Sequence, residues 1–328
     1  MTDATPAALI PTLQARVDEA LRTLITDAEP AELYEPIRYV LAGKGKRFRP
    51  LLVLLTARAL GTAAEDALPA ALSVEVFHNF TLVHDDIMDH SDERRGRPTL
   101  HVRWNDSTAI LGGDYLYLVA YEQLALLPPA VLPDALRTFN HMVKRLCEGQ
   151  MLDMAFETRP QVSVAEYLDM IDGKTGALLV ASLELGGLVG GATDEQQAAL
   201  RTAGAALGRA FQIQDDLLDL MTTSAKWGKR VGGDLIEGKK AYLLLQALER
   251  AEGDDHAWFQ RIVDDKGLLA DQVDEARERM LRLGIIDETR QTAESYYGQA
   301  LDALAVLPDT DATALLRDLI GTMRARLY

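Results

Sequence analysis

Two short acidic segments constrain the fold of this chain more than any other feature. Asp85-Asp86-Ile87-Met88-Asp89 and Asp215-Asp216-Leu217-Leu218-Asp219 share one spacing, and apolar residues precede both. On a helix, residues four apart share a face, so the outer aspartates of each segment point the same way. Like charges in apolar surroundings are costly unless a cation or a proton compensates them. The segments therefore predict two helices whose carboxylates bind a hard divalent ion such as Mg²⁺. Two solvated acidic faces are the alternative.

The rest of the sequence also favours helices. Of the 328 residues, 48% are hydrophobic but only 6% are aromatic, and Ala and Leu recur throughout. Capping boxes at 163–166 and 193–196 predict two helix starts, and residues 70 to 90 are typical of a buried helix. We expect one all-α domain over residues 1–328, a bundle of roughly ten or more helices around a central cavity lined by the aspartates.

Composition excludes several classes of protein. The formal net charge of −16 argues against nucleic-acid binding, which needs a basic surface. The one cysteine, Cys147, excludes an internal disulfide framework, and we expect it to be a small buried residue. We find no secretory signal and no apolar run of ~20 residues, so we expect a cytoplasmic protein without a membrane span.

Basic residues accompany both acidic segments. Gly43–Pro50 combines four cations and two glycines in a turn ahead of a helix, and Arg94–Arg97 follow the first acidic segment. Lys174-Thr175 would open a helix, and further lysines follow the second acidic segment. Each group alone could be a solvated surface run. Together they indicate a ligand with more than one phosphate.

These motifs, in this order, resemble the trans-isoprenyl diphosphate synthase (polyprenyl synthetase) family over nearly the whole chain. The matching segments are 45–50, 84–89, 94–99, 113–116, 174–175, 211–219, 228–229, 233–235 and 238–239. The resemblance implies an isoprenoid synthase-type fold and a head-to-tail condensation. An allylic diphosphate (dimethylallyl, geranyl or farnesyl) would ionise with the help of Mg²⁺, and isopentenyl diphosphate would attack the resulting cation.

The resemblance also implies a role for each residue of the motifs. Asp85 and Asp89 would be ligands of two Mg²⁺ ions and Asp215 of a third, with Asp86, Asp216 and Asp219 in supporting positions. The allylic diphosphate would be held by Arg94, Lys174, Lys229 and Lys239, with Thr175 and Gln212 nearer the reacting carbon. Isopentenyl diphosphate would be held by Lys46, Arg49, His78 and Arg95. For His78, a hydrogen-bonded core histidine is the alternative.

Two departures from the family pattern concern loops. Thr222–Trp227 replaces the usual Gly-Asp after the second acidic segment, and Ala241 replaces the polar residue that usually follows the second lysine. A class I terpene cyclase remains an alternative, although its Asn/Asp–Ser/Thr–Glu metal triad is missing from the sequence. A non-catalytic subunit of a heteromeric synthase is another alternative, although such subunits typically lose one acidic motif.

Residues just before the first acidic segment bear on the length of the product. Phe77 and Phe80 lie on the helix that carries Asp85, and the small Thr81 lies one turn from Asp85. Ordinary core packing is the alternative reading of both rings. In the family, this pattern resembles enzymes of the C20 product, so we expect C15 to C20, leaning to geranylgeranyl diphosphate. We also expect a homodimer, on the family pattern and because apolar helix faces need cover.

Overall fold

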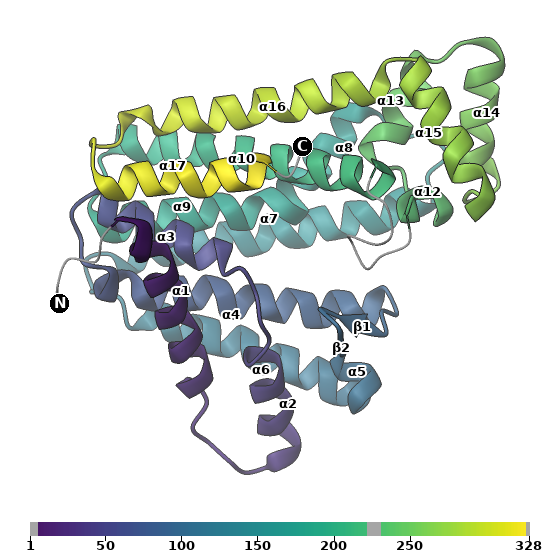
Figure 1. The fold of residues 1–328 in the computed structure, drawn as a ribbon. Coiled ribbons are helices and arrows are strands. Elements are labelled where there is room, and N and C mark those ends of the chain that lie inside the picture. Colours follow the sequence, from purple (N-terminus) through teal and green to yellow (C-terminus); the bar gives the residue numbers. More distant parts are fainter. Residues whose placement is uncertain (1–5, 222–230, 326–328) are drawn as a thin grey trace. The chain divides into compact units, whose positions relative to one another are not determined.

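A computed structural model describes residues 6–221 and 231–325, and most of these residues are helical (Figure 1). The helices are α1 (Pro6–Thr23), α2 (Ala31–Leu41), α3 (Phe48–Ala59), α4 (Ala64–Met88), α5 (Leu100–Arg103), α6 (Asp106–Ala125), α7 (Leu132–Thr158), α8 (Val164–Ile171), α9 (Ala177–Gly190), α10 (Asp194–Met221), α12 (Gly233–Ile236), α13 (Tyr242–Arg250), α14 (Gly253–Asp264), α15 (Val273–Arg282), α16 (Ile285–Ala303) and α17 (Asp311–Arg324). A π-helical turn, η1 (Asp172–Gly176), joins α8 to α9, and two 3-10 turns are η2 (Ala270–Gln272) and η3 (Leu304–Val306). The strands β1 (Glu93–Arg94) and β2 (Arg97–Pro98) form one small hairpin. The all-α prediction is confirmed.

The chain divides into two compact units. The first unit comprises the residues up to Asn140 together with Ala181–Arg201 and Val306–Arg317. The second comprises His141–Val180, Thr202–Ala305 and the residues from Asp318 onward. The first acidic cluster lies in the first unit and the second cluster lies in the second unit. The organisation as one domain stays a prediction.

Helix α4 is the core of the first unit because it is apolar on nearly every side. Its residues from Ala70 to Phe77 are all buried. It packs along α6 and α3, as the ribbon in Figure 1 shows. The predicted buried helix over residues 70 to 90 is therefore confirmed, with its start at Ala64 and its end at Met88.

In the second unit, a buried glutamine anchors α10. Gln214 is fully buried, and its side-chain amide donates to the backbone oxygen of Met323 at 2.9 Å. Its side-chain oxygen accepts from the Tyr297 hydroxyl at 2.6 Å. These bonds tie α10 to α16 and to the end of α17, and they satisfy both polar ends of a buried amide. The contacts that hold α10 in place are therefore made at Gln214, the residue just before the second acidic cluster.

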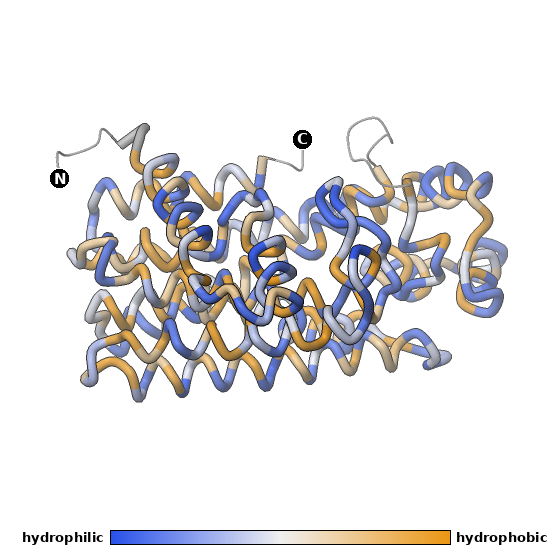
Figure 2. Tube along the Cα trace, turned by 90° about the horizontal axis from the view of Figure 1, so that it is seen from below, coloured by the Kyte–Doolittle hydropathy of each residue, from blue (hydrophilic) through white to orange (hydrophobic). Residues whose placement is uncertain are grey.

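Most predicted helix ends are confirmed. Ser163 and Glu166 form the capping box of α8, and Thr193 and Gln196 exchange the two equivalent bonds at the start of α10. Pairs of residues that contain proline or two glycines, at 128–129, 159–160, 190–191, 232–233 and 307–308, all lie at or beyond the end of a helix or at its start. Hydrophobic and hydrophilic residues are interspersed along most helices, as Figure 2 shows, which is typical of helices with one buried face.

Two expectations are wrong. Lys174-Thr175 does not open a helix, because the backbone continues from α8 through η1 into α9. The turn lies inside this continuous helical path and close against α7, since a Cβ on Gly149 would lie 2.2 Å from the Lys174 backbone nitrogen. Cys147, expected to be buried, is exposed on α7. Helical periodicity did not indicate which face of α7 carries it.

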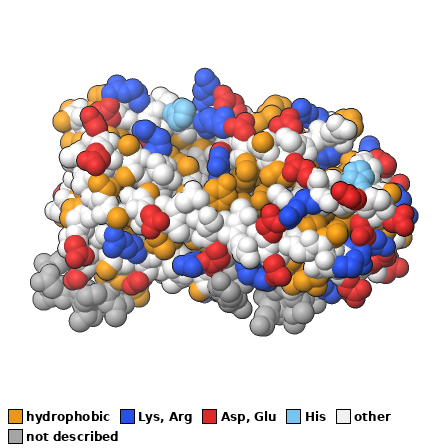
Figure 3. Space-filling model, turned by 90° about the horizontal axis from the view of Figure 1, so that it is seen from above, with side chains coloured by type: hydrophobic (Ala, Val, Ile, Leu, Met, Phe, Trp, Pro, Cys, Tyr) orange, Lys and Arg blue, Asp and Glu red, His pale blue; other side chains and the backbone are white. Residues whose placement is uncertain are grey.

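The surface carries charges of both signs, and the helices are of limited hydropathy. Acidic and basic side chains are interspersed over the face shown in Figure 3. Among residues 6–221 and 231–325, no helix is both long and apolar enough to cross a membrane. The absence of nucleic-acid binding and the cytoplasmic location stay predictions.

Candidate active site

The three aspartates of the first cluster have different surroundings at the end of α4. Asp85 is half-buried, Asp86 is buried, and Asp89 is exposed at the helix C-cap. Asp86 Oδ1 accepts from Nε and Nη2 of Arg94, both at 2.6 Å. Burial raises the pKa of Asp86, although Arg94 acts in the opposite direction. The two outer carboxylates are therefore the accessible pair, and the middle one holds an arginine.

Arg94 reaches Asp86 because a tight hairpin follows the cluster. β1 and β2 pair antiparallel with Arg94 opposite Arg97, so only Arg95 and Gly96 form the turn. Both turn residues have positive φ, 56° and 71°, as a two-residue type I′ turn requires. Arginines directly opposite each other would repel. Asp86 compensates Arg94, and Arg97 lies 3.8 Å from the ring centroid of Tyr39.

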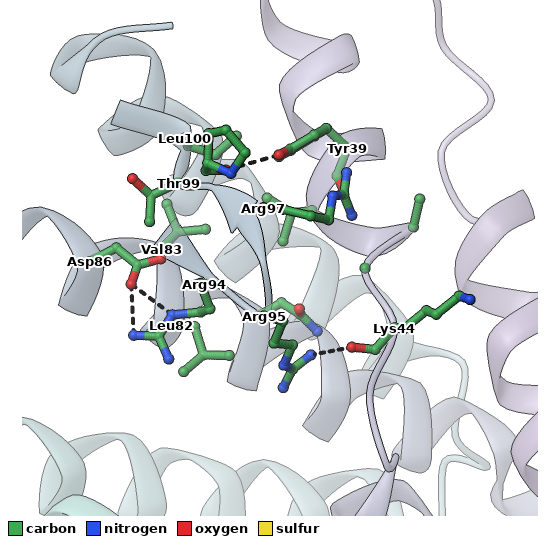
Figure 4. A pocket seen from close by; sticks show the side chains of 15 residues that line it. Tyr39, Lys44, Leu82, Val83, Asp86, Arg94, Arg95, Arg97, Thr99 and Leu100 are labelled. Carbon is green, nitrogen blue, oxygen red and sulfur yellow. Dashed lines mark hydrogen bonds and ion pairs between the residues drawn. The ribbon is translucent and has the colours of Figure 1, made fainter. Parts of the chain in front are cut away.

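A cavity of about 270 Å³ opens beside this hairpin in the first unit (Figure 4). Its cationic lining residues are Lys44, Arg94, Arg95 and Arg97, and its apolar ones include Leu82, Val83 and Leu100. Figure 4 shows Arg95 donating to the Lys44 backbone oxygen, at 3.0 Å. The wall suits a ligand with an anionic head and a short apolar body. Arg95 lines this cavity, whereas Lys46, Arg49 and His78 are not among its lining residues.

The basic residues of the turn before α3 differ in how deeply they are buried. Arg47 is buried at the N-cap of α3, with φ at 49°, and its guanidinium binds Glu75 and Asp18 at 2.7 Å each. Lys46 is exposed and Arg49 is half-buried. The ion pair of Arg47 with Glu75 is therefore a core contact that fixes the turn. Lys44, Lys46 and Arg49 are the cations of this turn that remain at least partly accessible.

His78 is neutral beside Arg49. Burial, and then Arg49, hold the pKa of His78 well below its usual range. Arg49 Nη1 lies 3.2 Å from His78 Nε2. Because a guanidinium only donates, Nε2 accepts and the ring proton lies on Nδ1. The histidine is thus hydrogen-bonded, as the core alternative requires, and it also lies against a cation of the predicted set.

The second cluster repeats the burial pattern of the first on α10. Asp215 and Asp219 are half-buried, and Asp216 is buried. Asp216 accepts from the Tyr167 hydroxyl, from the Tyr242 backbone N–H at 3.0 Å and from the Gln212 amide at 3.0 Å. Burial raises the pKa of Asp216. All three donors are neutral groups.

A chain of hydrogen bonds leads from Asp216 to the π-turn. The Gln212 amide nitrogen faces Asp216, so its oxygen is free to accept from Thr175 Oγ1, at 2.9 Å. The hydroxyl proton of Thr175 is used in this bond. The lone pairs of both oxygens are then available to a neighbouring positive charge. The neighbouring Lys174 ammonium pairs with Asp153 of α7.

Residues after α10 complete the second group. Asp219 Oδ2 accepts from the Asp234 backbone N–H at 3.1 Å. Burial, and then Asp216, raise the pKa of Asp234 from 3.8 to about 7. Lys239 is exposed and pairs with Glu237 at 2.9 Å. Lys229 and the loop 222–227 lie outside the described residues.

The residues predicted to set product length lie in the first unit. Phe77 is fully buried, Phe80 is half-buried, and their ring centroids are 5.2 Å apart. Thr81 is buried and its hydroxyl donates to the His78 backbone oxygen at 2.9 Å. All three therefore lie on the helix of the first cluster, at the positions that the sequence predicted.

Three residues with a place in these networks were not predicted: Asp153, Tyr167 and Asp234. Asp153 and Tyr167 are distant in sequence from the groups they bind, by 21 and 49 residues. Asp234 belongs to a segment that had already carried the family resemblance, so that segment was the available signal.

The oxygen donors of each cluster suit Mg²⁺, provided that waters or substrate phosphates supply the remaining metal ligands. Only carboxylate oxygens are offered, and Mg²⁺ typically binds one or two carboxylates together with waters and substrate phosphates. Among residues 6–221 and 231–325, no three or more His, Cys, Asp or Glu side chains form a metal site on their own. Asp85 and Asp89 in the first unit, and separately Asp215 in the second, are the carboxylates that would hold Mg²⁺.

Comparisons with known proteins agree with the motifs. The family model described as polyprenyl synthetase matches residues 30–280. The chain is 39% identical over 317 residues to a geranylgeranyl diphosphate synthase of Methanosarcina mazei, covering 96% of each chain. It is 36% identical to a geranylfarnesyl diphosphate synthase of Natronomonas pharaonis, covering 95% of each. Among solved structures, the geranylgeranyl pyrophosphate synthetase of Pyrococcus horikoshii Ot3 matches with a TM-score of 0.88 and 37% identity, covering 97% of this chain and 98% of that one.

Proposed function

Because this chain belongs to the polyprenyl synthetase family of prenyltransferases, we propose that it condenses isopentenyl diphosphate with an allylic diphosphate in the cytoplasm. The product would be a short-chain polyprenyl diphosphate of C15 to C20, leaning to geranylgeranyl diphosphate. One observation carries the proposal. Each acidic cluster has a buried, hydrogen-bonded middle aspartate and outer aspartates that are half-buried or exposed.

Three of the four outer aspartates are the proposed metal ligands. Asp85 and Asp89 would hold two Mg²⁺ ions and Asp215 a third, all in the presence of the allylic diphosphate. When bound, the ions supply positive charge that stabilises the departing diphosphate. Asp86 and Asp216 would support these ligands through their own hydrogen bonds, Asp86 to Arg94 and Asp216 to Gln212. Asp219 is held by the Asp234 backbone N–H and would act through water.

Cationic side chains would hold the diphosphates. Arg94, Lys174, Lys229 and Lys239 would bind the allylic substrate, and the described three already have carboxylate partners that a diphosphate can replace. Lys46, Arg49, His78 and Arg95 would bind isopentenyl diphosphate. Neutral His78 is compatible with this role because its Nδ1–H is a donor.

Two oxygens would stabilise the allylic cation. Asp216 orients Gln212 so that the Gln212 side-chain oxygen faces Thr175. The Thr175 hydroxyl donates its hydrogen bond to that oxygen. The lone pairs of both oxygens can therefore face positive charge as the carbon–oxygen bond of the substrate breaks. The sequence motifs contain no obvious general base, so the departing diphosphate is the proposed proton acceptor.

The activity is tested with the purified chain, isopentenyl diphosphate, farnesyl diphosphate and MgCl₂. We expect release of diphosphate and a chromatographic product no longer than C20, and loss of both signals with EDTA. Silence that ends only when a second protein is added would favour the non-catalytic subunit. A cyclic hydrocarbon formed without isopentenyl diphosphate would favour a terpene cyclase. Products of C30 or more would overturn the length assignment to Phe77, Phe80 and Thr81.

A homodimer is the proposed assembly. Helix α6 carries exposed Leu111 and Leu118, 61% and 51% accessible, and the groove beside them is lined by Pro30, Leu33 and Tyr115. Such a face is suited to cover by a second copy. Sedimentation equilibrium at micromolar concentration should show a dimer that Leu111→Glu with Leu118→Glu dissociates. Leu269→Glu, equally exposed at 68% on another part of the chain, is the control. A wild-type monomer would contradict the proposal.

A further inference from the structure

A seam of rings runs between α4 and α6 in the first unit. The His84 ring lies over Gly113, whose Cβ, if present, would be 2.3 Å from His84 Nε2. One turn further from the acidic cluster, Phe80 contacts Tyr117, with ring centroids 5.3 Å apart. Moving one turn toward the start of α4 therefore corresponds to moving one turn toward the end of α6, because the two helices are antiparallel.

The third level of the seam is a buried cluster. Phe77 contacts both Tyr117 and Phe139, with centroid distances of 5.9 and 5.2 Å. Phe139 in turn contacts Tyr121 at 5.1 Å. Phe77 and Phe139 are fully buried, whereas Phe80, Tyr117 and Tyr121 are half-buried. The rings with accessible surface therefore come from α6 as well as from α4.

A hydroxyl chain fixes the two tyrosines. The Tyr117 hydroxyl donates to the Tyr121 hydroxyl at 3.3 Å, and that hydroxyl donates to Asn140 Oδ1 at 2.6 Å. Burial raises the pKa of Tyr121. Tyr117 also contacts Phe77, Phe80 and Tyr121 through its ring. Its position is thus determined from three sides.

We propose that Tyr117 of α6 is the ring that stops the growing chain, and that Phe80 and Phe77 hold it in place. This inference rests on the proposed prenyl transfer and extends it to a residue on a second helix. Phe80 and Phe77 lie about 7.5 and 12 Å along α4 from Asp85. Because Tyr117 touches both rings, it lies at the depth of a short polyprenyl tail. It also stays in place when either phenylalanine alone is shortened.

Product analysis with isopentenyl diphosphate and farnesyl diphosphate tests the assignment. We expect Tyr117→Ala and Tyr117→Leu to lengthen the main product by at least one isoprene unit. Phe80→Ala should give only a minor longer product, and Tyr117→Phe, which keeps the ring, should give the wild-type length. Tyr115→Ala is the matched control, because Tyr115 lies on the same helix but contacts Tyr34, at 5.5 Å.

Each outcome separates this inference from the proposed function. An active Tyr117→Leu enzyme with the wild-type product overturns the role of Tyr117 and leaves prenyl transfer intact. The same holds if Tyr115→Ala lengthens the product equally, since α6 would then merely be loosened. A wild-type chain that forms no prenyl product overturns the proposed function itself. If Tyr117→Ala fails to fold by circular dichroism, Tyr117→Leu, which retains apolar volume, decides the question.

Discussion

The two acidic clusters share one sequence pattern but hold their buried aspartate in different ways. Asp86 is compensated by the charged guanidinium of Arg94, whose side chain is 36% accessible. Asp216 is held by neutral groups, among them the Tyr167 hydroxyl, and both residues are at least 95% buried, with 5% and 3% of their surface accessible. Because its side chain is partly accessible, Arg94 can exchange the Asp86 carboxylate for a more highly charged anion such as a diphosphate. Buried neutral donors have no such alternative.

This difference assigns different tasks to one motif. In the first cluster, the middle aspartate holds an arginine that a diphosphate can take over. In the second, the middle aspartate is a fixed point from which Gln212 and Thr175 are oriented. The first aspartate is alike in both clusters, since Asp85 and Asp215 are both half-buried and both proposed as metal ligands. Substitutions at outer and middle positions should therefore separate the shared property from the divergent one.

The largest expected effect concerns the outer positions. Asp85→Ala and Asp215→Ala should each lower kcat by about 100-fold or more, because each removes a proposed metal ligand. Circular dichroism should show an intact fold, and the metal-free variants should be no less stable, since repulsion between carboxylates is relieved. Initial rates at saturating substrates and Mg²⁺ measure the effect.

Asp66→Ala is the control for these variants, because Asp66 is an exposed aspartate in the first turn of the same α4. It should keep near-normal turnover. If Asp85→Ala or Asp215→Ala also kept it, the metal assignment of that residue would be wrong, and the likeness of the two clusters would be one of sequence alone.

A smaller effect should distinguish the middle positions. Asp216→Asn keeps one acceptor oxygen for Tyr167 and Tyr242, so its new amide faces Gln212. Gln212 must then turn over and present its amide nitrogen to Thr175, which removes an oxygen from the proposed cation. We expect kcat to fall about 10-fold, or about 1.4 kcal/mol in the barrier, with KM little changed.

Asp86→Asn should show the reverse division. It releases Arg94 from a charged partner without altering the oxygens near the reacting carbon. We expect KM for the allylic diphosphate to change several-fold, with kcat nearly constant. Steady-state kinetics with the allylic substrate varied measures both parameters. If Asp216→Asn changed only KM and Asp86→Asn only kcat, the comparison of the clusters would have to be inverted.

The last expected effect is a pH dependence of stability that arises at Asp234, beside the second cluster. The pKa of Asp234 is raised to about 7 in the folded chain, from its ordinary value of 3.8. The folded state therefore binds this proton more tightly than the unfolded state does. Its contribution to stability is present below pH ~4 and is lost as the pH rises toward 7.

The Asp234→Asn variant measures this contribution. In EDTA, wild-type stability should fall relative to that of the variant by roughly 1–3 kcal/mol between pH 5 and pH 8, because partial exposure weakens the full shift. Thermal unfolding at the two pH values gives the difference. Asp254→Asn, at another helix start in the same unit, is the control. Equal pH dependence of wild type and Asp234→Asn would show that Asp234 ionises normally.

Sequence spacing predicted the parts of this site that depend on local structure. The carboxylates at Asp85 and Asp89 share a helix end because they are four residues apart, and the start of α10 follows from the cap at Thr193. The hairpin that brings Arg94 to Asp86 was not predicted, because its turn places Arg95 at a positive φ that arginine seldom adopts.

Contacts between distant segments could not be read from spacing. Tyr167 meets Asp216, and Asp153 meets Lys174, only because helices pack side by side in the second unit. The basic run before α3 gave no sign that Arg47 is buried with Glu75 while Lys46 stays exposed. Burial within a run of like residues is decided by the neighbouring helices, and a run of charges contains no record of them.

The π-turn η1 makes the number of residues in this region as important as their identity. It holds one residue more than a regular α-helical turn would. Deleting Gly173 would remove no assigned functional group, yet α8 could then continue into α9 as one regular helix. The rest of α9 would keep its orientation relative to α8, because the wider turn absorbs the extra residue, and only the residues inside the turn would rotate about the helix axis. Lys174 and Thr175 would turn away from Asp153 and Gln212, so here the length of the chain itself encodes part of the site.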